Sequence, residues 1–331
     1  FVRFPFFLLI WCLLFAAAAA MRLKLAKTLW GVDDASFVDR WDAMFARIRN
    51  EGFDAVEAIP LTFNMNPKMF RQCLDEHGLA LIAQVHTSSA FDAEKGHYAY
   101  MTSRDVSVHK SSLSTLVDVA QGMGAVMVNV HGGCDCWETK DVHDYLQHAV
   151  QVAETKGITV SHETHRRRIL YSPFAYRDCF LGDSEVARAL DNVRVTADLS
   201  HWAVVCERVF GMPDSDAENG VDDWWPRVLA DVSKRAALVH ARVGFGEGPQ
   251  VPDPTAPEYR GEVDAHMTWW ESVWRTRAGA GDDVAWVEPE FGPAPYLWAL
   301  PHTRAPVADL WRVNADMAKM VKERFERTKL P

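Results

Sequence analysis

Short apolar runs alternate with amphipathic segments along the chain from Met21 onward. The apolar runs are short enough for buried strands, whereas helices normally need longer patterns. Their regular spacing between helical patterns is typical of strands in a parallel sheet. Eight such runs predict strands at Leu23–Trp30, Gly52–Glu57, Leu79–His86, Ala125–His131, Gly157–His162, Val193–Asp198, Ala236–Arg242 and Val284–Glu290.

The segments between these runs carry apolar residues at helical spacing. In the first of them, Trp41, Phe45 and Ile48 fall on one face of a helix. Gly78 and Gly157 directly follow two of the segments, and glycine at that place is a stop signal. We therefore predict helices at Ala35–Asn50, Pro67–His77, Val106–Met123, Thr139–Lys156, Ser184–Leu190, Val221–Arg235, Val263–Arg277 and Pro306–Arg327.

Eight strand–helix units predict a closed barrel. Strands that alternate with helices form a parallel sheet, and eight repeats fit a single (β/α)8 TIM barrel. A doubly wound open sheet would normally carry a G-x-G-x-x-G turn after its first strand. Here that turn reads Gly31-Val32-Asp33-Asp34, which does not match. Long loops follow strands six and seven, at 202–220 and 243–262, and such loops usually build a site or its lid.

The first residues do not belong to this pattern. Residues 1–20 are almost wholly apolar, with Arg3 as the only charge, which suits the core of a signal peptide. However, the chain begins with Phe1, and Met21 stands directly before the first predicted strand. We therefore assign 21–331 to the barrel and leave 1–20 as a signal-like or artefactual segment. The protein is cytoplasmic if Met21 is the true start, and enters the secretory pathway or an organelle if 1–20 is a signal.

The composition indicates which kinds of partner and which cellular compartment are favoured. The 331 residues are 48% hydrophobic and 24% charged, which is typical of a globular protein. The net charge of −10 disfavours nucleic acid as a partner, because a negative chain repels phosphate backbones. Six cysteines without a framework spacing favour a reduced compartment. We expect no membrane contact for the folded domain, and a homo-oligomer is compatible with the sequence.

Residue types that bind metals end most of the predicted strands. Around strand five, Glu163 stands between two histidines and before Arg166-Arg167-Arg168. Because the C-terminal ends of all barrel strands meet at one face, we expect the side chains there to converge. They are Glu57, His86, His131, Glu163, Asp198 with His201, His240 with Arg242, and Glu288 with Glu290.

Carboxylates and an imidazole suit a divalent ion with open positions, such as Mn²⁺, Mg²⁺, Co²⁺ or Zn²⁺. Such an ion can hold a hydroxyl and a carbonyl oxygen of a substrate and polarise them. A neighbouring carboxylate can then move a proton on the adjacent carbon. Glu288 and Glu290 lie two apart and face the same way in a strand, so both are candidates.

With these residues in this order, the chain from Met21 to its end resembles the xylose isomerase-like TIM barrel superfamily. That superfamily contains sugar isomerases and epimerases, and also endonuclease IV. The specific signals are Glu at strand five, Asp-x-x-His after strand six, His at strand seven and Glu at strand eight. The resemblance implies four metal ligands, and it favours Glu290 over Glu288 because Pro-Glu-Phe-Gly-Pro resembles the family's strand-eight ending. The implied ligands are Glu163, Asp198, His240 and Glu290.

In the ketose epimerases of this superfamily, the glutamates of strands five and eight are the acid–base pair, here Glu163 and Glu290. Endonuclease IV instead adds histidines after earlier strands and an Asp-x-His, which together hold three zinc ions. His86, His131 and Asp264-Ala265-His266 could supply these additions. Against this, Asp264 and His266 follow an insertion in a Trp-rich helical stretch, and the chain lacks a basic balance.

We therefore expect a divalent-metal-dependent isomerase or epimerase of a sugar, sugar acid or polyol, which moves a proton through an enediolate. The expected partner is a small-molecule carbohydrate. The alternatives are a multi-zinc phosphodiesterase of the endonuclease IV type and a non-catalytic sugar-binding barrel. The residues expected to contact substrate are His201, Arg242, His86, His131, Arg166 and His266.

Overall fold

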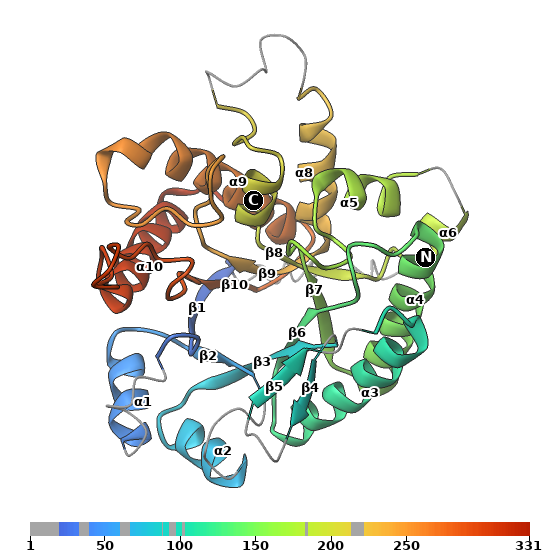
Figure 1. The fold of residues 1–331 in the computed structure, drawn as a ribbon, viewed down its shortest axis with the longest axis horizontal. Helices are drawn as coiled ribbons and strands as arrows, with labels where there is room; N and C mark the ends of the chain where they lie inside the picture. The colour runs from blue at the N-terminus through green and yellow to red at the C-terminus, as the bar shows by residue number, and fades with distance from the viewer. Residues whose placement is uncertain are drawn as a thin grey trace, which may run out of the picture.

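Eight parallel strands close into one barrel (Figure 1). The structure is a computed structural model, and it describes residues 20–32, 40–59, 67–87, 89–92, 97–100, 103–182, 185–212 and 222–331. The order of hydrogen-bonded neighbours is β1-β10-β9-β8-β7-β6-β3-β2, which confirms the predicted single (β/α)8 TIM barrel. The barrel strands are β1 (Arg22–Thr28), β2 (Ala55–Ala58), β3 (Ala80–His86), β6 (Met127–His131), β7 (Thr159–Glu163), β8 (Arg194–Ala197), β9 (Ala236–His240) and β10 (Val284–Glu288).

Helices connect the strands and lie outside the barrel (Figure 1). Their ends follow local signals: the Asp105 side chain accepts a hydrogen bond from Ser107 N–H at 2.8 Å where one helix begins. Another ends at Gly157, which has a φ of 62°. The helices are α1 (Trp41–Asn50), α2 (Pro67–Glu76), α3 (Val106–Gly122), α4 (Thr139–Lys156), α5 (Pro173–Phe180), α6 (Glu185–Arg188), α7 (Ser200–Val205), α8 (Trp225–Arg235), α9 (Arg260–Gly279) and α10 (Leu310–Arg327).

Two helices and one hairpin were not predicted, and all lie in connections that follow barrel strands. They are α5, α7 and an antiparallel hairpin of β4 (Ser89–Asp92) and β5 (His97–Tyr100). The sequence offered a signal for α5, because Ser172 caps its start by accepting from Ala175 N–H and Pro173 follows. The long connection after β9 contains a short 3₁₀ helix, Pro257–Tyr259, directly before α9.

The barrel interior changes from apolar to polar along the strands. At one level Ala26, Ala55, Ile82, Met127 and Leu238 pack together as a small buried cluster. Every second residue of a strand faces the same side, so the residues two and four positions further on also face the interior. These positions carry Glu57 on β2, Asn129 and His131 on β6, and His240 on β9, all buried. The alternation of side chains along the strands therefore places a layer of polar residues next to the apolar layer, nearer the C-terminal ends of the strands.

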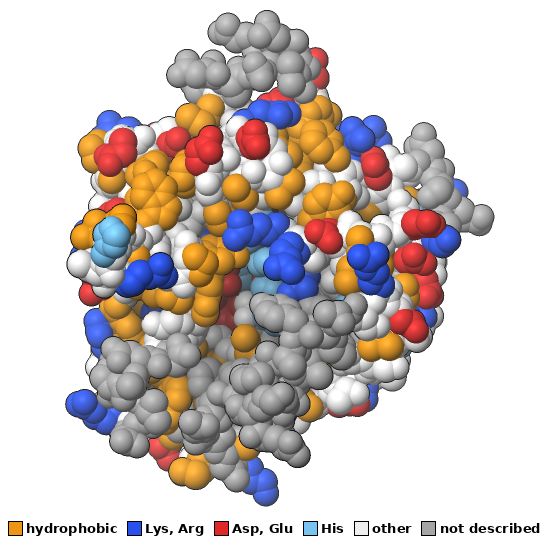
Figure 2. Space-filling view, in the orientation of Figure 1, with side chains coloured by type: hydrophobic (Ala, Val, Ile, Leu, Met, Phe, Trp, Pro, Cys, Tyr) orange, Lys and Arg blue, Asp and Glu red, His pale blue; other side chains and the backbone are white. Residues whose placement is uncertain are grey.

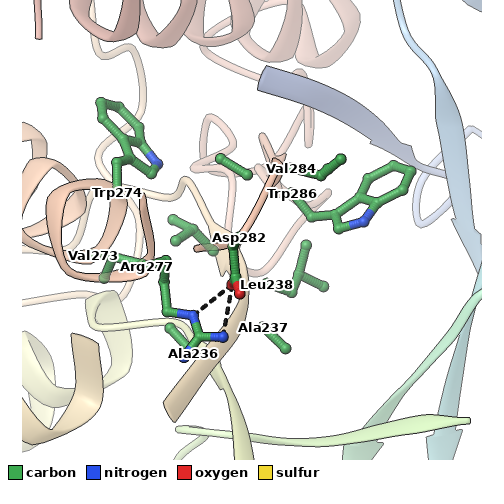
Figure 3. A pocket seen from close by; sticks show the side chains of 11 residues that line it. Ala236, Ala237, Leu238, Val273, Trp274, Arg277, Asp282, Val284 and Trp286 are labelled. Carbon is green, nitrogen blue, oxygen red and sulfur yellow. Dashed lines mark hydrogen bonds and ion pairs between the residues drawn. The ribbon is translucent and has the colours of Figure 1, made fainter. Parts of the chain in front are cut away.

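Two cavities lie at the opposite end of the barrel, where the strands begin. One of about 380 Å³ is lined by the starts of β6, β7, β8, β9 and β10, and one of about 20 Å³ lies between β9, β10 and α9. Figure 3 shows Arg277 beside Asp282 in this cavity, and their ion pair has an N–O distance of 2.6 Å. In barrels of this kind the N-terminal end serves stability, whereas sites lie at the C-terminal end.

Within the described part of the chain, no helix is both long and apolar enough to cross a membrane. Residues 1–19 lie outside the described ranges, so the segment 1–20, the domain start at 21 and the localisation remain predictions. Residues 33–39, the predicted start of the first helix, and 213–221 in the long connection after β8 also lie outside them.

Candidate metal centre and substrate cleft

The four predicted metal ligands meet at the C-terminal end of the barrel. Glu163 ends β7 and His240 ends β9, while Asp198 and Glu290 follow β8 and β10. One ligand atom from each residue lies within 4.8 Å of the others. None of the four residues is more than 3% exposed. Strand ends that are far apart in the chain thus form one compact, buried group.

His240 stands at the centre of this group. Its Nδ1 atom lies 3.0 Å from Glu290 Oε2 and 3.6 Å from Glu163 Oε2. Its Nε2 atom lies 3.2 Å from Glu57 Oε2 on the other side. A carboxylate on one ring nitrogen orients the imidazole and leaves the other nitrogen for a metal. Glu57 therefore aims His240 Nδ1 at the acidic ligands.

The group has the donors and the charge that fit a divalent ion. Glu163 Oε1 is buried without a hydrogen bond to any described residue. Such an atom is costly unless something else binds it. Once Glu163, Asp198 and His240 have lost their protons, the three acidic ligands outnumber the one neighbouring cation, Arg242, so the group carries a net negative charge that favours a divalent cation.

Arg242 holds two of the acidic ligands in place. Its Nη2 atom pairs with the Asp198 carboxylate, and its Nη1 atom lies 3.3 Å from Glu290 Oε2. The backbone N–H of Ser200 donates to the other oxygen of Asp198 at 3.1 Å. Because Arg242 is only 1% exposed, its charge acts here with little screening by water.

The two candidate acid–base groups have opposite pKa shifts. Burial raises the pKa of Glu163 to about 7, although His240 opposes the shift. Burial also raises the pKa of Glu290, but His240 and Arg242 outweigh it and lower the value to about 2. Environments that separate the pKa values of two carboxyl groups suit one as acid and the other as base. Burial raises the pKa of Asp198 to about 7 as well.

The geometry separates Glu288 from Glu290. Glu290 belongs to the four-residue group and lines the open cleft. Glu288 is fully buried and groups instead with Glu57 and His240. Burial and the nearby Glu57 carboxylate raise the pKa of Glu288 well above its usual value. The arrangement is therefore consistent with the expectation that Glu290, not Glu288, is the ligand at the cleft.

Neutral histidines form one wall beside the group. His131 Nε2 lies 2.7 Å from Glu163 Oε2, and its ring stacks on His86 with centroids 4.2 Å apart. The His165 ring lies 4.6 Å from His131 and 3.8 Å from His201. Burial lowers the pKa of His131 to about 3, and it lowers the pKa values of the other three well below the usual range. The uncharged rings of His86, His131 and His165, which line the cleft, can donate to or accept from substrate hydroxyls.

A cleft of about 520 Å³ opens above the group, a size typical of small-molecule sites. Figure 2 shows a hollow with red acidic and pale-blue histidine side chains inside it and blue basic side chains along its edge. The cleft is lined by Trp30, Ile59, Gln84, His86, His131, His165, Arg166, Arg167, Arg168, Arg242, Glu290, Pro295 and Tyr296.

The predicted substrate contacts divide into two groups. His86, His131, Arg166 and Arg242 line the cleft. His201 does not, because it is fully buried behind His165 with its Nε2 atom 2.8 Å from Arg242 Nη2.

His266 is also absent from the cleft lining. It lies on α9, where its Nδ1–H donates to Glu262 O at 2.8 Å and its Nε2 accepts from Gly244 N–H at 3.2 Å. Both ring nitrogens of His266 therefore form hydrogen bonds with the backbone. The expected contact of His266 with substrate has no support in this arrangement.

Sequence reasoning assigned no role to several residues of the site. Asn129 Nδ2 donates to Glu163 Oε2 at 2.8 Å, and its position two residues before His131 could have revealed it. Glu57 was expected at this face, but its contact with His240 was not predictable from a strand pattern. His165 and Tyr296 lie in irregular segments, where no periodic signal exists.

Comparisons with known proteins agree with this fold. The family model described as xylose isomerase-like TIM barrel matches residues 45–250. No curated protein matches the chain. A xylose isomerase-like TIM barrel protein from Mycobacterium smegmatis, solved with magnesium, has a TM-score of 0.54 at 17% identity, covering 91% of this chain and 96% of that one.

Two further structures are similar. The 3-keto-D-glucoside 4-epimerase from E. coli has a TM-score of 0.52 at 14% identity, covering 91% of this chain and 100% of that one. A sugar phosphate isomerase/epimerase from Parabacteroides distasonis has a TM-score of 0.52 at 13% identity, covering 95% and 98%. At these identities the likeness establishes the fold alone.

Proposed function

Because the chain belongs to the xylose isomerase-like TIM barrel family, we propose that it is a divalent-metal-dependent isomerase or epimerase. Its substrate would be a small sugar, sugar acid or polyol. The observation that carries the proposal is the four-residue group of Glu163, Asp198, His240 and Glu290 beneath an open cleft. The sugar isomerases and epimerases among the similar structures, and one neighbour solved with magnesium, add support of a coarser kind.

Glu163, Asp198, His240 and Glu290 would hold the metal ion, which would supply Lewis-acid polarisation of substrate oxygens and so make a neighbouring C–H more acidic. Glu290 starts as the base, because its pKa of about 2 keeps it ionised. Glu163, which belongs to the same group of ligands, is the partner of Glu290 in this proton transfer and returns a proton to the substrate carbon. Arg242 stabilises negative charge that develops on a substrate oxygen. His86 and His131 bind hydroxyl groups as neutral imidazoles.

One observation favours the multi-zinc hydrolase as a second candidate. Ligand atoms of His131, Glu163 and His165 also lie within 4.8 Å of one another, and this group shares Glu163 with the first. A third group, Glu57, His240 and Glu288, shares His240 with the first. Asp264 and His266, the pair expected for a multi-zinc site, belong to no such group among the described residues. The isomerase or epimerase therefore remains the better supported function.

Deuterium exchange tests the proposed function directly. The metal-loaded protein is incubated in D₂O with a panel of ketoses and keto acids of sugars, and NMR follows deuterium at the carbon next to the carbonyl. We expect exchange with at least one substrate, and its loss in Glu163→Gln. A matched control is Glu138→Gln, whose side chain is 73% exposed. We expect this control to retain the exchange.

Three other results would contradict the proposal in different ways. Cleavage of a phosphodiester without exchange would identify the hydrolase. Metal-independent sugar binding without turnover would identify a binding protein. Exchange that persists at full rate in Glu163→Gln would exclude the assigned acid.

A further inference from the structure

Charge is divided between the floor and the edge of the cleft. Glu290 of the acidic metal group lines the cleft, and so do three consecutive arginines, Arg166, Arg167 and Arg168. Figure 2 shows basic side chains beside the hollow, next to its histidine and acidic side chains. The whole chain has a net charge of −10, so a local concentration of arginine here is not explained by composition.

The cleft arginines differ in their partners. Arg242 is engaged by Asp198 and Glu290 on the floor. Neither Arg166 nor Arg167 forms an ion pair with a carboxylate of the described residues. Arg166 is half-buried and Arg167 is exposed, so both guanidinium groups can be reached from the cleft. Two arginines without acidic partners at one mouth are typical of anion recognition.

The backbone that presents these arginines is strained. Arg168 N–H donates to His165 O at 3.1 Å, which closes a turn with Arg166 and Arg167 at its centre. Arg167 has a φ of 66°, in the left-handed region. Glycine normally takes this position of a turn because a side chain there is unfavourable. Backbone strain of this kind is found mostly at functional sites, such as ligand-binding sites.

An aromatic wall joins the two ends of the cleft. The guanidinium carbons of Arg166 and Arg242 each lie 5.0 Å from the Tyr296 ring centre, so they are separated by at most twice that distance. Trp30 meets the same ring edge-on with centroids 4.9 Å apart. A short carbon chain lying along Tyr296 and Trp30 can therefore reach the floor with one end and Arg166 with the other.

We propose that Arg166 and Arg167 form an anion subsite, which binds a phosphate or carboxylate group at the end of the substrate away from the metal group. The substrate class is then a sugar phosphate or a sugar acid rather than a neutral sugar. This inference rests on the proposed function for the identity of the substrate, but the subsite itself can be tested by binding alone.

Calorimetric titration provides the test, with the full chain in metal-loaded and chelator-treated forms. The probes are inorganic phosphate, D-fructose, D-fructose 6-phosphate and D-gluconate. We expect one of the anionic sugars to bind about 10- to 100-fold more tightly than D-fructose, because hydrogen bonds to charged groups are strong. The preference should weaken as salt is added. Tighter binding of the phosphate or of the carboxylate probe identifies which anion the substrate carries.

Variants separate this role from a structural one. Arg167→Gly relieves the positive φ, so we expect an equal or higher melting temperature together with loss of the anion preference. Arg166→Gln should also lose the preference. Arg177→Gln is the matched control, because Arg177 is an exposed arginine of α5 outside the cleft. We expect this control to bind all four probes as the unaltered protein does.

The inference is overturned if neutral and anionic sugars bind equally, or if the preference survives in both cleft variants. Failure of the proposed function looks different. Anion binding that requires Arg166 and Arg167, but without exchange in any substrate, would keep the subsite and overturn the isomerase. Exchange of neutral sugars without an anion preference would keep the isomerase or epimerase and overturn the anion subsite.

Discussion

Metal uptake should expel protons from the protein, in a number that falls as the pH rises. Burial raises the pKa values of Glu163 and Asp198 to about 7 in the metal-free protein. The carboxylates around His240 raise its pKa well above the usual value, although burial opposes them. All three side chains must lose their protons to bind a metal ion. Protons that these groups hold before binding therefore appear in solution afterwards.

The number of protons follows from these pKa values. At pH 7 each carboxyl group is about half protonated and His240 is fully protonated, so about two protons leave per metal ion. At pH 6 both carboxyl groups are mostly protonated, and the release rises to about three. At pH 8 both are mostly ionised, and only about one proton leaves, from His240.

Titration calorimetry measures this release. Mn²⁺ is titrated into chelator-treated protein at pH 6, 7 and 8, in buffers with different ionisation enthalpies. The slope of the observed enthalpy against the buffer enthalpy gives the protons released per metal ion. Asp198→Asn removes one titrating ligand, so any binding that remains should release about one proton fewer at pH 6. A release below half a proton at every pH, or one that grows with pH, would refute this reasoning.

Two further predictions concern residues around the metal group. Glu57→Gln removes the carboxylate 3.2 Å from His240 Nε2, so we expect metal affinity to fall about 10- to 100-fold. Competition with a fluorescent chelator measures this affinity. Unchanged affinity would exclude Glu57 as the residue that positions His240. Gly244→Ala would place a Cβ 2.4 Å from the Ser200 carbonyl oxygen, so we expect a loss of about 1–3 kcal/mol of stability. Thermal unfolding tests this against the control Gly122→Ala, whose added Cβ meets nothing within 4 Å beyond its chain neighbours and the backbone of its own helix, and equal melting temperatures of the two variants would contradict it.

The strand ends were predictable because their positions follow from local periodicity. Helix α4 begins at Thr139 and ends at Lys156, as its pattern and Gly157 predict. Once a closed barrel is inferred, chain order alone brings Glu163 and His240 to one end. The converging residues could therefore be named without knowledge of any contact.

The rest of the site depends on contacts that no strand or helix pattern encodes. His266 is a residue type that binds metals and stands in an Asp-x-His spacing with Asp264. Its two ring nitrogens nevertheless form hydrogen bonds with Glu262 O and Gly244 N–H. His165 reaches the cleft through a turn after β7, and Tyr296 through the irregular segment after β10. Periodicity could not separate Glu288 from Glu290, because side chains two apart in a strand share a direction. The resemblance favoured Glu290, and its role as a ligand remains a prediction.

Anomalous diffraction from crystals grown with Mn²⁺ tests the central claim most directly. We expect a peak within about 2.0–2.4 Å of ligand atoms from Glu163, Asp198, His240 and Glu290. Asp198→Asn should weaken or abolish that peak. A peak bound only by His131 and His165, or no peak at the floor of the cleft, would contradict the proposed metal centre and the chemistry derived from it.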